Sequence, residues 1–408
     1  MSAIGGLLST TTGASTNEYV SEFQQGILVR NTRGLNVGTT LFGLMSKLSN
    51  ENAENNTFNW FERDPVTRIV YSKGATASNV TNSGLLFDDN GGTSASVYGI
   101  LQLGVTIKNV RTGEIMRITQ VTANATDVAC NVERAFDNGA AFINDNDAWV
   151  VITKASDEGA DPAIAVFETA ATLFNYVQTF SSSMYLTNAF KGSKLRTDIA
   201  GPLQERRIQA LERICRDIEF AYFFGKPTTK TGTNGTVYYT GGIKAAVDAS
   251  SGASTNVLNG NDTSGTSLAN VQNWLQSFMT VGSDSKLFLA GPKTYAAFSN
   301  YANSGTNGFR ITGQENVFGM NITTINTPFG ALDLAMHPLF KEVTEFADWG
   351  FVVDLAMIVQ KVMEPLFLEP NIQTPGKDAY QEQFRAKYGL KMKFSTAFGY
   401  CYDFSKIT

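Results

Sequence analysis

The stretch that decides the fold is residues 202–224, which read PLQERRIQALERICRDIEFAYFF. Pro202 suits the first turn of a helix, where its missing N–H leaves no hydrogen bond unmade, and Gly225 stands where helices commonly end. Between them, apolar residues recur at helical spacing. The stretch therefore predicts one amphipathic helix, roughly 35 Å long at 1.5 Å per residue. A helix of that length can span a domain.

The two faces of this predicted helix differ in chemistry. One face is apolar and is expected to be buried, and it carries Leu203, Ile208, Leu211, Ile214, Cys215, Ile218, Ala221 and Tyr222. The opposite face is polar and is expected in solvent, and it carries Glu205, Arg206, Gln209, Glu212, Arg213, Arg216 and Glu219.

On the C-terminal side of the helix, a second helix at 268–279 is followed by strands mixed with helices up to residue 354, which predicts an α+β region. Residues 383–395 then alternate between apolar even positions and polar odd positions, as a long strand with one buried face does. The polar face is basic and carries Arg385, Lys387, Lys391 and Lys393. An ordinary solvated sheet face is the first interpretation of these four residues, and electrostatic contact with DNA or with an acidic neighbouring subunit is the functional alternative.

On the N-terminal side, residues 57–72 and 163–190 have the aromatic and β-branched content of an extended ribbon. Short strands with turn residues between 97 and 153 predict a small β-barrel inserted into that ribbon. Residues 1–52 lack apolar residues at a fixed period and are expected to form an arm. Arm and ribbon cannot bury their apolar side chains alone, so we expect contacts with other subunits at Phe23, Leu28, Phe58, Trp60, Phe61, Phe174, Tyr176 and Phe180.

Composition excludes several classes of function. Only 17% of the 408 residues are charged, and the net charge of −5 argues against a protein held to nucleic acid by a general positive field. One histidine and three widely spaced cysteines form no metal-binding motif, and no nucleophile or phosphate-loop motif is present. His337 is expected to be a packed or hydrogen-bonded residue rather than a catalytic base. We therefore expect no catalytic residue, no metal site and no cofactor.

Further segments carry a resemblance to a known family. They are RICRDIEF at 213–220, TGGI at 240–243, VFGMNI at 317–322 leading to TPFGAL at 327–332, and FVVD at 351–354. With the order of elements, they resemble the major capsid proteins of tailed bacteriophages, which have the Hong Kong 97-type fold. Within that fold, the sequence is similar to the branch that carries a β-barrel in its extended loop.

The resemblance implies an α+β capsid fold with four parts. These are an N-terminal arm at 1–52, an extended loop at 53–190 with the barrel at 97–155, a peripheral domain at 191–226 and 375–408 that holds the long spine helix, and an axial domain at 227–374. It implies a non-enzymatic subunit of the virion capsid, assembled in the cytoplasm of the host bacterium into pentamers and hexamers of an icosahedral head around double-stranded DNA.

The partners implied are further copies of the chain, portal and scaffolding proteins, a decoration protein, and packaged DNA contacted non-specifically, with no membrane. Two alternatives stay open at this point. One is an encapsulin-like shell that packages protein. The other is a glycan-binding adhesin that uses aromatic residues of the barrel, such as Trp149, as stacking platforms, although Trp149 fits a core position in an alternating strand equally well.

Overall fold

The computed structural model describes residues 41–48, 50–63, 68–76, 84–89, 99–124, 127–134, 139–156, 158–159, 170–192, 202–250, 255–260, 266–303, 310–317 and 320–407. Phe23 and Leu28 of the expected arm lie outside these residues. The chain forms two compact units. One comprises residues 1–60 and 173–408, and the other comprises residues 61–172. Within the described residues, no helix combines the length and the apolar character needed to cross a membrane.

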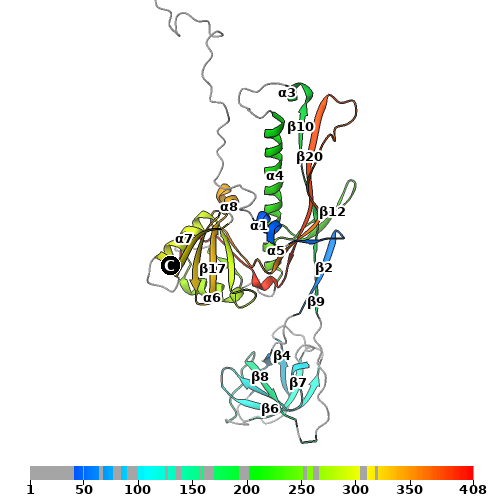
Figure 1. The fold of residues 1–408 in the computed structure, drawn as a ribbon. Coiled ribbons are helices and arrows are strands. Elements are labelled where there is room, and N and C mark those ends of the chain that lie inside the picture. The colour runs from blue at the N-terminus through cyan, green and yellow to red at the C-terminus, as the bar shows by residue number, and fades with distance from the viewer. Residues whose placement is uncertain are drawn as a thin grey trace, which may run out of the picture. The chain divides into compact units, whose positions relative to one another are not determined.

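The predicted long helix is confirmed as α4, Pro202–Phe224. It packs on a four-stranded sheet, and Figure 1 shows α4 running alongside two of the sheet's strands, β10 and β20. The strand order is β1 (Asn50–Asn52), β19 (Ile358–Glu369), β20 (Ala379–Met392) and β10 (Gln178–Thr187). β20 pairs antiparallel with both β19 and β10, so the predicted long C-terminal strand lies in the interior of this sheet.

The faces of α4 follow the helical wheel with two exceptions. Ile214, Ile218 and Tyr222 are fully buried in the main core, as predicted. Ile208, expected in the core, leaves 52% of its surface exposed. Glu219, expected in solvent, is fully buried because other segments of the chain close over it.

The same unit contains a second, seven-stranded sheet. Its strand order is β13 (Val257–Asn259), β21 (Gly399–Tyr402), β18 (Gly350–Val353), β14 (Ser285–Ala290), β17 (Gly330–Met336), β16 (Met320–Thr327) and β15 (Arg310–Val317). Helix α6 (Leu268–Met279) lies against β13, and α7 (Pro292–Asn303) lies against β15 and β17 (Figure 1). The core here combines aliphatic side chains with five buried aromatic ones, Trp274, Phe278, Phe288, Phe298 and Phe404. The predicted α+β class is confirmed.

Strands on either side of the predicted boundary at 374 and 375 pair with each other or join the other sheet. β19, placed by the sequence analysis in the axial region, pairs with β20 along almost its whole length. β21, placed in the peripheral region, pairs with β13 and β18 of the seven-stranded sheet. β21 is buried on both faces: Tyr400 lies in the cluster that also holds residues of the four-stranded sheet, and Cys401 lies in a second cluster with α6 and α7.

The second unit contains a closed six-stranded barrel, which confirms the predicted insert. The strands run in the order β3 (Ile69–Lys73), β4 (Leu85–Asp88), β7 (Val128–Glu133), β6 (Ile115–Ala123), β5 (Val105–Asn109) and β8 (Ala148–Lys154). The barrel begins earlier than the predicted residue 97, because β3 and β4 complete it. Val70 of β3 and Phe87 of β4 are fully buried, and Ile69 pairs with Val150 to close the ring.

The remaining elements are short. β2 (Thr57–Glu62) pairs with β9 (Ala171–Tyr176) in a two-stranded sheet where the chain passes from one unit to the other. β11 (Thr228–Gly232) and β12 (Gly235–Tyr239) form a hairpin. The other helices are α1 (Leu41–Leu48), α3 (Asn188–Gly192), α5 (Ile243–Asp248) and α8 (Pro338–Glu342), with 3-10 turns at Thr344–Phe346 and Ser395–Ala397.

Candidate subunit interface

The β2–β9 sheet, which we call the ribbon, carries the most exposed aromatic side chains of those predicted. Phe61 leaves 74% of its surface exposed and Phe174 leaves 55%. Phe58 and Trp60 stack on each other and are half-buried. A two-stranded sheet is marginally stable in water by itself, and exposed phenyl rings gain by being covered. The ribbon is therefore a surface that a further protein chain would stabilise.

The inner end of the ribbon is tied to its own unit. Tyr176 packs against Phe174 and against Tyr238 of β12, with ring centres 5.6 and 5.7 Å apart. Gly389 of β20 leaves room for the ring of Phe58, since a Cβ at that glycine would lie 2.7 Å from a carbon of the ring. The end of the ribbon that carries Phe58 and Tyr176 is thus packed against its own unit.

Phe180 differs from the other predicted residues, because only 4% of its surface is exposed and it belongs to the main core. On β10 the even-numbered residues from Phe180 to Leu186 are buried and the odd-numbered ones are exposed. Phe180 therefore stabilises the subunit itself, and it is not accessible to a neighbouring chain in this structure.

The basic strand is largely neutralised within the subunit. Lys387 lies 2.8 Å and Arg385 3.5 Å from carboxylate oxygens of Glu364, and Lys391 lies 3.4 Å from Glu51. The hydrogen bond from Lys387 holds the pKa of Glu364 below its ordinary value. Lys393 follows the last residue of β20. We call this set of ion pairs the charge ladder.

The charge ladder extends to β1 and β19. Lys361 lies 2.7 Å from Glu51, and its hydrogen bond is the main reason that the pKa of Glu51 is lowered. Arg385 also lies 3.7 Å from Glu369. The acidic partners are far away in sequence, so the alternation within residues 383–395 alone gave no sign of them.

Glu219 is a structural residue that the sequence analysis missed. Its carboxylate accepts hydrogen bonds from the backbone N–H groups of Leu41 and Phe42 at 2.7 and 2.8 Å, and it lies 2.8 Å from Nε2 of His337. The N-terminus of α1 is thus capped by a carboxylate from another helix. The expected hydrogen-bonded role of His337 is confirmed.

The sequence analysis also missed a second buried pair, between β14 and the residue that follows β18 in the seven-stranded sheet. Lys286 and Asp354 are both fully buried, with Nζ and Oδ2 3.3 Å apart. Lys286 also donates to the carbonyl oxygens of Val281 and Ala397, so its ammonium group is fully hydrogen-bonded. Burial lowers the pKa of Lys286 from its ordinary value. Such pairs fix the positions of segments and offer no open chemistry.

The barrel presents no aromatic platform at Trp149. Its indole is fully buried and packs edge-on against Phe87, with ring centres 6.2 Å apart. This is the core position that the alternating strand also allowed, so Trp149 is not available as a stacking platform for the adhesin alternative.

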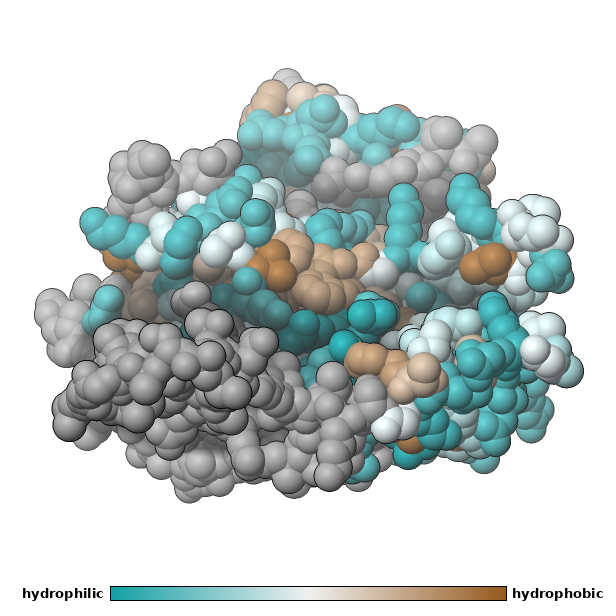
Figure 2. All heavy atoms as spheres, turned by 90° about the horizontal axis from the view of Figure 1, so that it is seen from above, coloured by the Kyte–Doolittle hydropathy of each residue, from teal (hydrophilic) through white to brown (hydrophobic). Residues whose placement is uncertain are grey.

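In Figure 2, hydrophobic residues gather in patches between hydrophilic ones on the face that is shown.

Comparison with known proteins identifies the family. A model described as "SU10 major capsid protein" matches residues 35–404. No curated protein matches the sequence. Among solved structures, a chain from Mycobacterium phage Adephagia aligns at 12% identity over 97% of this chain and 98% of its own, with a TM-score of 0.46. The capsid of a native GTA particle aligns at 8% identity over 97% and 99%, with a TM-score of 0.48.

An encapsulin complex from Synechococcus elongatus PCC 7942 aligns at 10% identity over 58% of this chain and 78% of its own, with a TM-score of 0.41. The resemblance predicted from the sequence is confirmed by the family match, and the barrel of the predicted branch is present. The protein has a Hong Kong 97-type capsid fold and is a structural protein of the phage head shell, not an enzyme. The chain belongs to the SU10 major capsid protein family.

Proposed function

We propose that this subunit closes into pentamers and hexamers, and that these build an icosahedral head around double-stranded DNA. The observation that carries the proposal is the ribbon, where Phe61 and Phe174 are more than half exposed on a two-stranded sheet. Covering a phenyl ring contributes about 2 to 3 kcal/mol. Repeated around a ring of subunits, such contacts reinforce one another, because each contact made brings the next within reach.

We propose the following domain organisation for the subunit. Residues 1–52 act as the arm, and residues 53–190 form the extended loop that carries the barrel. The four-stranded sheet with α4 acts as the peripheral domain, and it includes β19. The seven-stranded sheet acts as the axial domain, and it includes β21. The strand pairings support these revised boundaries.

We also propose partners beyond further copies of the chain. These are portal and scaffolding proteins, a decoration protein, and packaged DNA. The charge ladder would meet DNA or a neighbour as a nearly neutral surface, because Arg385, Lys387 and Lys391 are already paired with carboxylates. Contact with DNA would then be weak and non-specific, since few cations remain to displace counterions.

The ribbon is tested by replacing both rings, Phe61→Ser with Phe174→Ser, in the full chain. The matched control is Phe142→Ser, which removes a phenyl ring that is 51% exposed in the barrel unit. We expect the ribbon variant to fold and stay soluble but to give few or no closed particles by sedimentation and negative-stain microscopy. The control should give wild-type particles. A normal yield of shells from the ribbon variant would refute the role of the ribbon.

The arm is tested by deleting residues 1–35. The deletion must end before α1, because Leu41, Phe42 and Met45 are buried in the main core and their removal would destabilise the subunit itself. We expect a folded subunit with a wild-type melting temperature that no longer forms shells. Shells of normal yield would remove the arm from the assembly contacts.

A further inference from the structure

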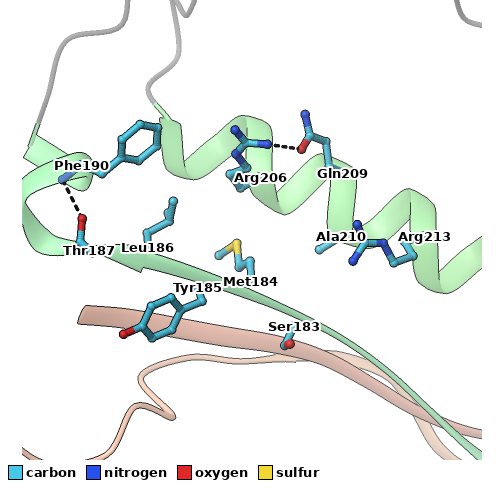
Figure 3. Close-up of a pocket in the computed structure, with 10 residues that line it drawn as sticks. All are labelled: Ser183, Met184, Tyr185, Leu186, Thr187, Phe190, Arg206, Gln209, Ala210 and Arg213. Carbon is cyan, nitrogen blue, oxygen red and sulfur yellow. Dashed lines mark hydrogen bonds between the residues drawn. The ribbon is translucent and has the colours of Figure 1, made fainter. Parts of the chain in front are cut away.

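A groove of about 470 Å³ lies between β10 and α4 in the first unit. Figure 3 shows the strand along one side and the helix along the other, with Met184 and Leu186 rising between them. The lining residues are Ser183, Met184, Tyr185, Leu186, Thr187, Phe190, Arg206, Gln209, Ala210 and Arg213. A groove with a strand on one wall and a helix on the other is a known form of site for an extended peptide.

The strand wall presents a backbone edge. Residues 183–187 are consecutive, so the groove follows the strand itself and not only one of its faces. Within the described part of the chain, β10 is the outermost strand on its side of the sheet and pairs only with β20. Its sequence QTFSSSMYLT has no charge and no proline, the usual devices that keep an edge from pairing. Among the described residues, this edge of β10 therefore has no strand partner.

The helix wall presents positive charge. Arg206, Gln209, Ala210 and Arg213 follow one another at the spacing of a single helix face. Arg206 donates a hydrogen bond to Gln209 at 2.8 Å, and both arginines are exposed. Among the described residues, no carboxylate oxygen lies within 4 Å of either guanidinium, and Arg213 interacts at longer range with the carboxyl of Asp217 on the same helix. An incoming strand that fits this wall carries acidic side chains.

We propose that the groove receives residues 18–23 of a second copy of this chain, which add to β10 as an extended strand. The segment reads EYVSEF and holds both acidic residues of the first 40 positions, Glu18 and Glu22. The proposal rests on the proposed function, in which the arm of one subunit crosses another. It names the segment of the arm and the surface that binds it.

The spacing of charges supports this pairing. In a strand, Glu18 and Glu22 point to the same face and lie about 13 Å apart. On α4, Arg206 and Arg213 are separated by about 10 Å along the axis, a difference that flexible arginine side chains cover. Val20 lies between the two glutamates on that face, where it meets the apolar side chains of the groove.

The length of the arm also suits a second copy. Leu41 is held by Glu219, which lies about 20 Å along α4 from Arg206. The 18 positions from Phe23 to Leu41 span up to about 60 Å when extended, roughly three times the length needed to reach the groove of the same subunit. An arm of that length can cross to a neighbour.

The test exchanges the charges in the full chain. The groove variant is Arg206→Glu with Arg213→Glu, and the arm variant is Glu18→Arg with Glu22→Arg. Each should fold, with an unchanged melting temperature, and should lower the yield of closed shells about tenfold or more, because like charges then face each other. The chain with all four changes should recover to within about twofold of wild type, since the opposite charges are paired again.

Mixing the groove variant with the arm variant separates a contact between copies from a contact within one chain. Between copies, each arm finds a complementary groove on the other variant, and shells return. If the four-change chain assembles but the mixture does not, the segment binds its own subunit and the proposal is wrong. The specificity control combines the arm variant with Lys226→Glu and Lys230→Glu, exposed cations outside the groove, and should give no recovery.

Two other results also test the proposal. Normal shells from both the groove variant and the arm variant, or no recovery in the four-change chain, would overturn it while leaving the proposed function intact. A wild-type chain that forms no shells under any condition would instead contradict the proposed function.

Discussion

Oε1 of Glu219 lies 2.8 Å from Nε2 of His337, and neither side chain has any surface exposed to solvent. The two residues stand 118 positions apart, one on α4 and the other immediately before α8. The same carboxylate accepts the first two backbone N–H groups of α1. One buried acid thus fixes α1 and the segment before α8 against α4.

Glu219→Gln should destabilise the subunit, because an amide presents N–H groups where the backbone of α1 requires acceptors. We expect a loss of about 3 kcal/mol in the free energy of unfolding, the usual cost of breaking a buried polar network. Denaturant titration of the full chain measures it. Glu212→Gln, on the partly exposed side of the same helix, serves as the control and should change stability by no more than about 0.5 kcal/mol. Equal stability of the two variants would show that the buried network contributes nothing.

Replacing Phe180 should lower the stability of the subunit, whereas replacing Phe61 should lower its assembly into shells. Phe180→Ala removes a ring that is 4% exposed and should cost about 3 to 4 kcal/mol of folding free energy. Phe61→Ala removes a ring that is 74% exposed and should leave the melting temperature almost unchanged while lowering the yield of shells. Calorimetry and sedimentation of both variants check the contrast. Similar melting temperatures for the two would contradict the burial described for Phe180.

The barrel should lose stability in acid through Asp147. Two hydrogen bonds from the guanidinium of Arg111, at 2.8 and 2.6 Å, lower the pKa of this carboxyl from its ordinary 3.8 to about 2. Because the folded pKa lies below the unfolded one, the stabilisation is complete above about pH 4 and is lost as the pH falls through about 2.

Calorimetry of the full chain between pH 6 and 2 tests this titration. Arg111→Gln should be less stable than wild type at pH 6, and the difference should shrink as the pH falls. A constant difference across that range would rule out the titration of Asp147 as the cause.

Inside the barrel, Arg134 and Glu114 form an ion pair whose side chains are only 2% and 1% exposed. Arg134→Met leaves the carboxylate of Glu114 buried without its partner and should cost about 3 to 5 kcal/mol. The double change Arg134→Met with Glu114→Leu should cost less than Arg134→Met alone, because no unpaired charge then remains. Hydrogen exchange of the amides of β6 and β7 in the full chain measures the loss of stability in the single and in the double variant. A double variant less stable than the single one would contradict this account.

Much of the fold could be predicted because local sequence patterns determine it. The bounds of α4 follow from Pro202, Gly225 and the 3.6-residue period, and the barrel follows from short alternating strands between turns. The strand pairings depend on distant segments and could not be predicted in the same way. β3 reads as ribbon until its pairing with β8 is known, and the exchange of β19 and β21 between sheets leaves no local mark.

The candidate interface shows the same limit. An aromatic residue at period-two spacing faces either the core or a neighbour, and the pattern is identical for Phe174 and Phe180, although only Phe174 is exposed. The cations of β20 looked free in sequence because their partners, Glu51 and Glu364, come from other strands. Glu219 looked solvated because a helical wheel records only its own helix.

We propose that this chain forms a closed shell, and electron microscopy of the purified protein shows directly whether such shells exist. The protein should be produced alone and, if a scaffolding protein is encoded beside it, together with that protein. The account predicts closed particles of icosahedral symmetry, with pentamers at the vertices and hexamers between them. Dispersed monomers or irregular aggregates in both preparations would contradict it.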